Sequence, residues 1–235
     1  MTNRANEQQR IADWFDATYR RKGERYLRPL RAYYVFLELL QVTPDTRLLD
    51  IACGLGRLLE AAATYGVTGT GIDISPVAIE AAQQKLPDAK LVVGNAEQLP
   101  FADASFDVVT CLGSLERMMD RPRVLREMRR VASPDARFCL LVRNSATLGF
   151  RWLTGSRDQR RRRGHQDADS LANWQALFER TGFDIVDVLP DQYPLHKRKH
   201  WSRLGLGRVD FKVPIRPDGP IDGANEFLFI LKHAS

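Results

Sequence analysis

The sequence contains little cysteine. Three cysteines, at positions 53, 111 and 139, occur in 235 residues. Their odd number and wide separation argue against a disulfide framework, and no metal-ligand spacing appears. We therefore expect reduced packing residues in a cytoplasmic protein that holds no structural metal.

Long apolar runs are also missing. No segment approaches the roughly 20 apolar residues that a membrane-spanning helix needs. Residues 1–6 lack the apolar core of a signal peptide. The apolar share of 44% and charged share of 27% are typical of a globular chain that buries its core as one α/β unit. With no internal repeat, we expect residues 1–235 to form a single domain.

The most informative stretch that is present runs from Leu48 to Arg57. Apolar residues predict a buried strand, which ends in a turn containing Gly54 and Gly56, and a helix follows. Glycine lets the backbone adopt turn dihedrals and approach a ligand closely. The free N–H groups at the start of the helix then point at that ligand. The pattern predicts a nucleotide-type ligand.

An acid at the end of the next strand narrows the kind of nucleotide. Asp73 follows Gly56 by 17 residues, and a carboxylate there suits a ribose diol. A dinucleotide fingerprint would carry a third glycine where this chain has Leu59. Asp50 precedes the glycine turn instead, which gives the pattern D-x-x-x-G-x-G followed by G-x-D.

This pattern resembles that of the class I S-adenosylmethionine-dependent methyltransferases, in the small-molecule branch similar to type 11. Segments 91–101 and 105–116 resemble the family's adenine-binding strand end and its fourth strand with a functional tip. The resemblance covers roughly residues 45–145. It implies a Rossmann-like doubly wound sheet of seven strands, mostly parallel with an antiparallel C-terminal strand, plus N-terminal helices. The implied cofactor is S-adenosylmethionine, which becomes S-adenosylhomocysteine.

The resemblance also implies which residues bind the cofactor. They are Asp50, Ala52, Gly54, Gly56, Asp73, Ile74, Asn95, Ala96, Glu97 and Leu112. Asn95 stands where many relatives have aspartate, and its amide oxygen can still accept a hydrogen bond from adenine. Tyr19 and Arg28 resemble positions that close on the cofactor in some relatives; helix packing and surface charge are the alternatives for these two.

Catalysis of methyl transfer depends first on positioning, and a base is needed only when the acceptor must lose a proton. Glu116, at the tip of the fourth strand, is the first candidate for that base, and a salt bridge with Arg117 or Arg121 is the alternative. His165 and Tyr193 are further candidates. Arg117 stands where relatives often carry histidine, so a possible base is replaced by a permanent cation.

Strand and helix patterns alternate along most of the chain, which predicts a largely parallel sheet. We expect strands near residues 47–52, 68–73, 90–94, 106–112, 137–143, 184–189 and 226–232. We expect helices near residues 5–22, 25–41, 56–65, 76–85, 121–132 and 169–181. Residues 1–42 form a helical lid in this reading, residues 43–145 the cofactor-binding core, and residues 146–168 and 192–224 two insertions on the substrate side.

The net charge of +6 is concentrated in these insertions. Residues 151–163 hold six arginines and residues 196–216 hold seven Lys or Arg. They predict either an anion-binding mouth or only a solvated surface. The sequence thus favours methyl transfer to a small-molecule acceptor, possibly anionic. The alternatives are an RNA methyltransferase that uses the basic loops, and a cofactor-binding protein without catalysis.

Overall fold

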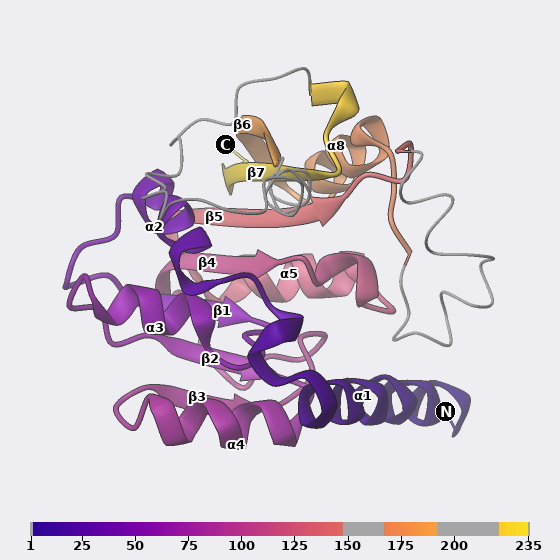
Figure 1. The fold of residues 1–235 in the computed structure, drawn as a ribbon. Helices are drawn as coiled ribbons and strands as arrows, with labels where there is room; N and C mark the ends of the chain where they lie inside the picture. Colours follow the sequence, from indigo (N-terminus) through magenta and orange to yellow (C-terminus); the bar gives the residue numbers. More distant parts are fainter. Residues whose placement is uncertain (1, 148–166, 192–220, 235) are drawn as a thin grey trace, which may run out of the picture.

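The computed structural model describes residues 2–147, 167–191 and 221–234 (Figure 1). Within them, one sheet of seven strands has the order β3-β2-β1-β4-β5-β7-β6. The strands are β1 Leu48–Ile51, β2 Thr70–Asp73, β3 Lys90–Val93, β4 Phe106–Leu112, β5 Ala132–Arg143, β6 Phe183–Asp191 and β7 Glu226–His233. β7 pairs antiparallel with β5 and β6, while the pairs among β1 to β5 are parallel. The expected fold class is confirmed.

The middle of the sheet is buried on both faces. All four residues of β1 are buried, because helices cover the strand from both sides. β1 lies between β2 and β4, so the strand order reverses beside it. In doubly wound sheets a ligand binds at such a reversal, outside the carboxyl ends of the strands. The glycine turn after β1 therefore lies where a binding site is expected.

Helices form a layer on each face of the sheet, and α3 and α5 lie on opposite faces (Figure 1). Among the described residues, one apolar core joins α5 and α8 to the sheet, a second joins α2 and α3 to it, and a smaller one packs α1 against α4. The helices are α2 Tyr34–Leu40, α3 Arg57–Ala63, α4 Pro76–Lys85, α5 Arg121–Val131 and α8 Leu171–Arg180. Side-chain caps by Ser75, Asp120 and Ser170 begin α4, α5 and α8.

The N-terminal segment begins with α1, Thr2–Lys22. The single helix expected over residues 25–41 is wrong. The chain instead forms two 3₁₀ turns, η1 Gly23–Tyr26 and η2 Leu30–Ala32, before α2 begins. Pro29 explains the break, because it has no backbone N–H and disfavours helical dihedrals at the residue before it.

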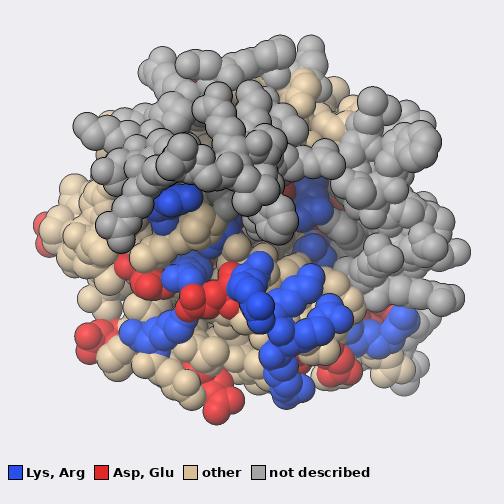
Figure 2. Space-filling view, viewed as in Figure 1, with Lys and Arg blue, Asp and Glu red and all other residues tan. Residues whose placement is uncertain are grey.

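Differences elsewhere are small. β5 begins five residues earlier than the expected 137, since the chain enters it directly from α5. No helix in the part of the chain that the structure describes is long and apolar enough to cross a membrane. Figure 2 shows a group of adjoining basic side chains in the lower centre of the visible face, with acidic side chains around it. The last turn of α1 contains Arg20, Arg21 and Lys22.

Candidate active site

Two adjoining pockets lie at the carboxyl ends of the central strands, beneath α1. The small pocket has a volume of about 60 Å³, and its lining includes Asp73, Ile74, Asn95, Ala96 and Glu97. The large pocket has a volume of about 340 Å³, and its lining includes Asp50, Gly54, Leu112, Arg28 and Arg143. Both pockets are lined by Phe15, Tyr19, Ala52, Ser114 and Arg117. We call these five shared residues the junction.

The glycine turn forms the floor beside the junction. Ala52, Gly54 and Gly56 have φ angles of +58°, +52° and +75°, in the left-handed region that glycine tolerates best. A Cβ atom on Gly54 would lie 2.7 Å from the Tyr19 hydroxyl oxygen. A Cβ atom on Gly56 would lie 2.9 Å from Leu86 Cδ1, so this glycine lets α3 and α4 pack together. Gly56 is not among the described residues that line either pocket.

Asp73 connects the end of β2 to the glycine turn. Its Oδ2 atom accepts a hydrogen bond from the Gly54 N–H at 2.8 Å, and its Oδ1 atom accepts one from the Ser75 N–H at 2.9 Å. Burial raises the pKa of the Asp73 carboxyl to about 6, although these hydrogen bonds oppose the rise. The carboxylate thus stabilises the turn and also lines the small pocket.

Asp50 is buried at the opposite side of the turn and lines the large pocket. Its Oδ1 atom accepts a hydrogen bond from the Thr110 hydroxyl at 2.7 Å. Burial raises the pKa of the Asp50 carboxyl to about 7. The charge of this group therefore changes near neutral pH, and a cation in the large pocket would favour its ionised form.

The loop after β3 contributes Asn95, Ala96 and Glu97 to the small pocket. Asn95 Oδ1 accepts a hydrogen bond from the Glu97 N–H at 3.0 Å, which shapes the loop. Glu97 Oε2 accepts hydrogen bonds from Arg4 at 2.6 Å and from Gln8 at 3.2 Å. The Glu97 carboxylate therefore anchors α1 above the pocket.

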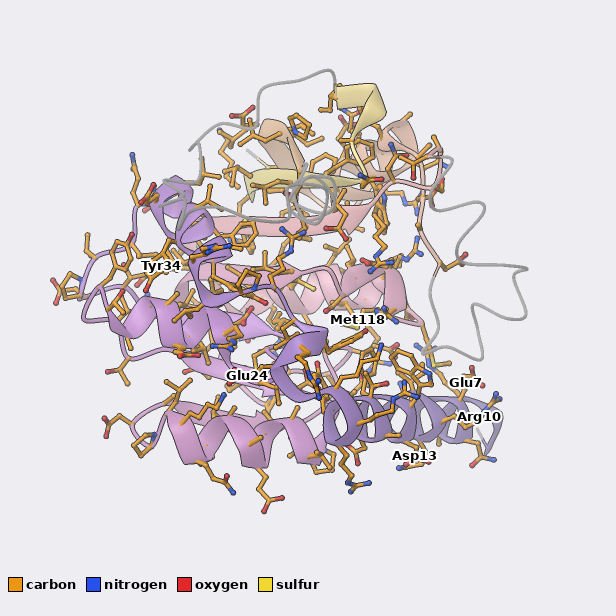
Figure 3. All side chains as sticks on the ribbon, viewed as in Figure 1. Glu7, Arg10, Asp13, Glu24, Tyr34 and Met118 are labelled. Atoms are coloured by element: carbon orange, nitrogen blue, oxygen red, sulfur yellow. The ribbon has the colours of Figure 1, made fainter. Side chains whose placement is uncertain are left out.

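α1 also contacts the site farther along its length. The Asp16 carboxylate accepts a hydrogen bond from the Ser75 hydroxyl, and the Tyr19 ring lies against Gly54. Met118, in the segment after β4, lies between α1 and the strands, whereas Asp13 is on the opposite side of α1 and points away from them (Figure 3). These contacts place α1 as a cover over the small pocket.

A chain of partly buried charges forms the far wall of the large pocket. The Arg28 guanidinium pairs with Asp191 and with Glu226. Arg143 Nε lies 3.5 Å from Glu226 Oε1 and 3.3 Å from Glu116 Oε1. Burial raises the pKa of the Glu226 carboxyl, while Arg28 and Arg143 oppose that rise.

Glu116 lies behind this wall. Its side chain is 0% exposed, and the described residues that line the two pockets do not include it. Among the described residues its carboxylate has the ion pair with Arg143 but no hydrogen bond of good geometry. The sequence suggested Arg117 or Arg121 as the salt-bridge partner of Glu116, but neither forms an ion pair with its carboxylate. Arg121 pairs with Asp169 at 3.5 Å instead.

The structure brings together all the expected cofactor-binding residues except Gly56 along the two pockets. His165 and Tyr193 lie outside the described residues, as do most of both basic insertions. Sequence reasoning missed Arg143 and Glu226, which face each other across the β5–β7 pair. An opposite-charge pair at the ends of two antiparallel strands is the signal that could have found them.

Comparisons with known proteins agree with this geometry. A family model described as "Methyltransferase domain" matches residues 49–140. The uncharacterized methyltransferase YcgJ of Bacillus subtilis is 30% identical over 212 residues, covering 86% of this chain and 77% of that protein. A demethylmenaquinone methyltransferase of Thermotoga maritima is 41% identical over 106 residues, but this covers only 44% of this chain and 45% of that protein.

Solved structures share the fold over nearly the whole chain. A chain in the complex between the Haloferax volcanii Trm112 methyltransferase activator and a methyltransferase has a TM-score of 0.71 at 20% identity, covering 96% of this chain and 98% of that one. Fold, site and relatives together define a methyltransferase. The chain belongs to the class I S-adenosylmethionine-dependent methyltransferases, in the type 11 branch, and its cofactor is S-adenosylmethionine.

Proposed function

We propose that this enzyme transfers a methyl group to a small-molecule acceptor bound in the large pocket. The observation that carries the proposal is the junction, where a small pocket with a mainly apolar lining and a larger pocket with aromatic and charged walls meet beside the glycine turn. A ligand made of a nucleoside and an amino acid fits this division. The adenosine part would lie in the small pocket, and the methionine part would enter the large one.

Asp73 suits the ribose. An ionised carboxylate offers about four acceptor positions, and two of those on Asp73 are used by the Gly54 and Ser75 N–H groups. The others can accept the two ribose hydroxyls. The Asn95 amide and the Ile74 and Ala96 positions line the same pocket, where the adenine ring would lie.

Asp50 suits the methionine amino group, because a buried carboxylate that lines the pocket gains most from a cationic partner. Gly54 lets the Tyr19 ring of α1 rest against the turn at the same place, since a Cβ atom there would meet the Tyr19 hydroxyl. Residues 1–42 would act as a lid, because Arg4, Gln8 and Asp16 hold α1 over the strand ends. The lid would exclude water from the reacting atoms.

The acceptor would occupy the rest of the large pocket. Five aromatic residues contribute to its lining: Phe15, Tyr19, Tyr26, Tyr33 and Phe36. Such walls favour an acceptor with an apolar or aromatic body. The bound cofactor supplies a methyl group on a sulfonium, and the protein's task is to hold the acceptor atom in line with it. Leu112 and Ser114, at the tip of β4, form the wall that sets this approach.

Glu116 would act through Arg143 as a positioning residue, because its carboxylate lies behind the pocket and not in its lining. Arg28 and Glu226 would hold the same wall from the other side. His165 and Tyr193 stay predictions from sequence. Three free, buried cysteines support a cytoplasmic location for the enzyme.

A labelled-methyl assay tests the proposal. The purified chain would be incubated with S-adenosylmethionine labelled on the methyl group and a cell extract that contains small metabolites, RNA and protein. We expect label to enter a small organic product with the wild type and with Asp107→Asn, whose carboxylate pairs with Arg47 away from both pockets. Asp73→Ala should transfer much less. Label that enters only RNA or protein would contradict a small-molecule acceptor.

A further inference from the structure

Arg117 supplies a positively charged side chain to the junction. It ends η3, the 3₁₀ turn Leu115–Arg117 that follows β4. Its side chain lines both pockets although the residue is only 9% exposed. The residue therefore lies where the two halves of the cofactor would meet, which is also where the methyl group would lie.

Aromatic groups hold the guanidinium in place. Its Cζ atom lies 5.5 Å from the ring centroid of Trp14 and 5.2 Å from that of Phe15. Its Nη2 atom donates a hydrogen bond to the Tyr26 hydroxyl at 3.3 Å. Contacts between cations and ring faces orient the planar guanidinium. Arg117 thus places a permanent positive charge at the junction.

The geometry points to a further role for Arg117: it selects an acceptor whose reacting atom is an oxyanion, such as a phenolate or a carboxylate. This inference rests on the proposed function. A guanidinium beside a sulfonium attracts a negative group between them. An amine acceptor would leave an ammonium product beside that guanidinium, and two like charges held close in a partly buried site repel each other.

The bonds and charges balance without a base at the site. The acceptor oxygen forms a bond to the methyl carbon while the carbon–sulfur bond breaks. The electron pair of the broken bond stays on sulfur, so the oxyanion and the sulfonium become a neutral ether or ester and a neutral thioether. No proton moves in this step. A site with a fixed cation in place of a histidine base suits an acceptor that is already ionised.

The first test uses binding alone. Calorimetry would give dissociation constants of S-adenosylmethionine and S-adenosylhomocysteine, which differ in the charge on sulfur, for the wild type, Arg117→Gln and Arg117→Lys. Removing the positive charge should shift the affinity ratio toward S-adenosylmethionine by about threefold to tenfold. Arg117→Lys should keep the wild-type ratio, because it keeps the charge but not the planar contacts. Thermal melts would check that each variant is folded.

Arg121→Gln is the matched control. Arg121 is also an arginine whose side chain is mostly buried against an aromatic ring, with its Cζ atom 4.7 Å from the Trp174 ring centroid. The described lining of the two site pockets does not include it. Its loss should leave the affinity ratio unchanged. An unchanged ratio in Arg117→Gln would overturn the inference, whereas failure of both ligands to bind the wild type would overturn the proposed function instead.

A second measurement addresses the acceptor. The protein loaded with S-adenosylhomocysteine would be titrated with 4-nitrophenol above its pKa and with 4-nitroaniline, two rings of similar size. We expect the phenolate to bind more tightly than the amine, and Arg117→Gln to remove that preference. Equal affinity for the two, or binding of the aniline alone, would overturn the inference, as would no binding of the phenolate.

Discussion

The contact between α1 and the glycine turn can be tested by replacing Gly54 with alanine. The new Cβ atom would lie 2.7 Å from the Tyr19 hydroxyl oxygen and 3.4 Å from Tyr19 Cζ. The first distance is impossible without movement of the ring, whereas the second is an ordinary contact. Alanine must also adopt the φ angle of +52° at this position.

Two costs therefore add in Gly54→Ala. The left-handed backbone costs about 1–2 kcal/mol, and the overlap with Tyr19 costs about 1–3 kcal/mol. Tyr19→Phe removes the hydroxyl oxygen and with it the overlap, but it leaves the backbone cost. The double variant should therefore be more stable than the sum of the single variants by at least about 1 kcal/mol.

Urea unfolding followed by circular dichroism would measure the free energy of unfolding of the wild type, the two single variants and the double variant. Gly113→Ala is the matched control, because its φ angle is +67° and nothing lies within 4 Å of its Cβ position. It should show the backbone cost alone, with no coupling to Tyr19→Phe. If the effects of Gly54→Ala and Tyr19→Phe add within about 0.5 kcal/mol, the ring does not rest on the turn and the reasoning is refuted.

Three further predictions concern the pockets and the lid. Asp73→Ala should weaken cofactor binding by about 1–3 kcal/mol in calorimetry, and unchanged affinity in a folded variant would sink the ribose assignment. Cofactor affinity should fall as the pH drops below about 7, because binding must then ionise Asp50; a profile that Asp50→Asn does not flatten would assign the titration elsewhere. Arg4→Ala should speed hydrogen exchange in the first turns of α1 but leave the midpoint of urea unfolding nearly unchanged, since the Arg4 side chain is half-exposed; unchanged exchange would argue against this anchor.

Residue patterns within short segments predicted most of the strands. They also predicted the part of the site formed by the loops that follow β1, β2 and β3. The turn after β1 and the acid at the end of β2 follow from residues close in sequence, and parallel strands bring their carboxyl ends to one edge. The broken helix near Pro29 could also have been predicted from that single residue.

The charged wall of the large pocket could not be predicted in the same way. Arg28 and Glu226 are 198 positions apart, and their pairing depends on how the N-terminal segment crosses the sheet. The inward direction of Glu116 depends on the 3₁₀ turn after β4, which a strand pattern does not specify. Long-range packing determines the Arg28–Glu226 pair and the direction of Glu116. As a result Glu116, the base expected from sequence, lies behind the charged wall, while Arg117 reaches the junction.

Calorimetric titration of the purified chain with S-adenosylmethionine, S-adenosylhomocysteine and NAD tests the central claim most directly. The two-pocket site predicts micromolar dissociation constants for both sulfur compounds and no binding of NAD, because the turn has Leu59 where a dinucleotide fingerprint has its third glycine. Binding of NAD, or no binding of either sulfur compound to the folded protein, would contradict it.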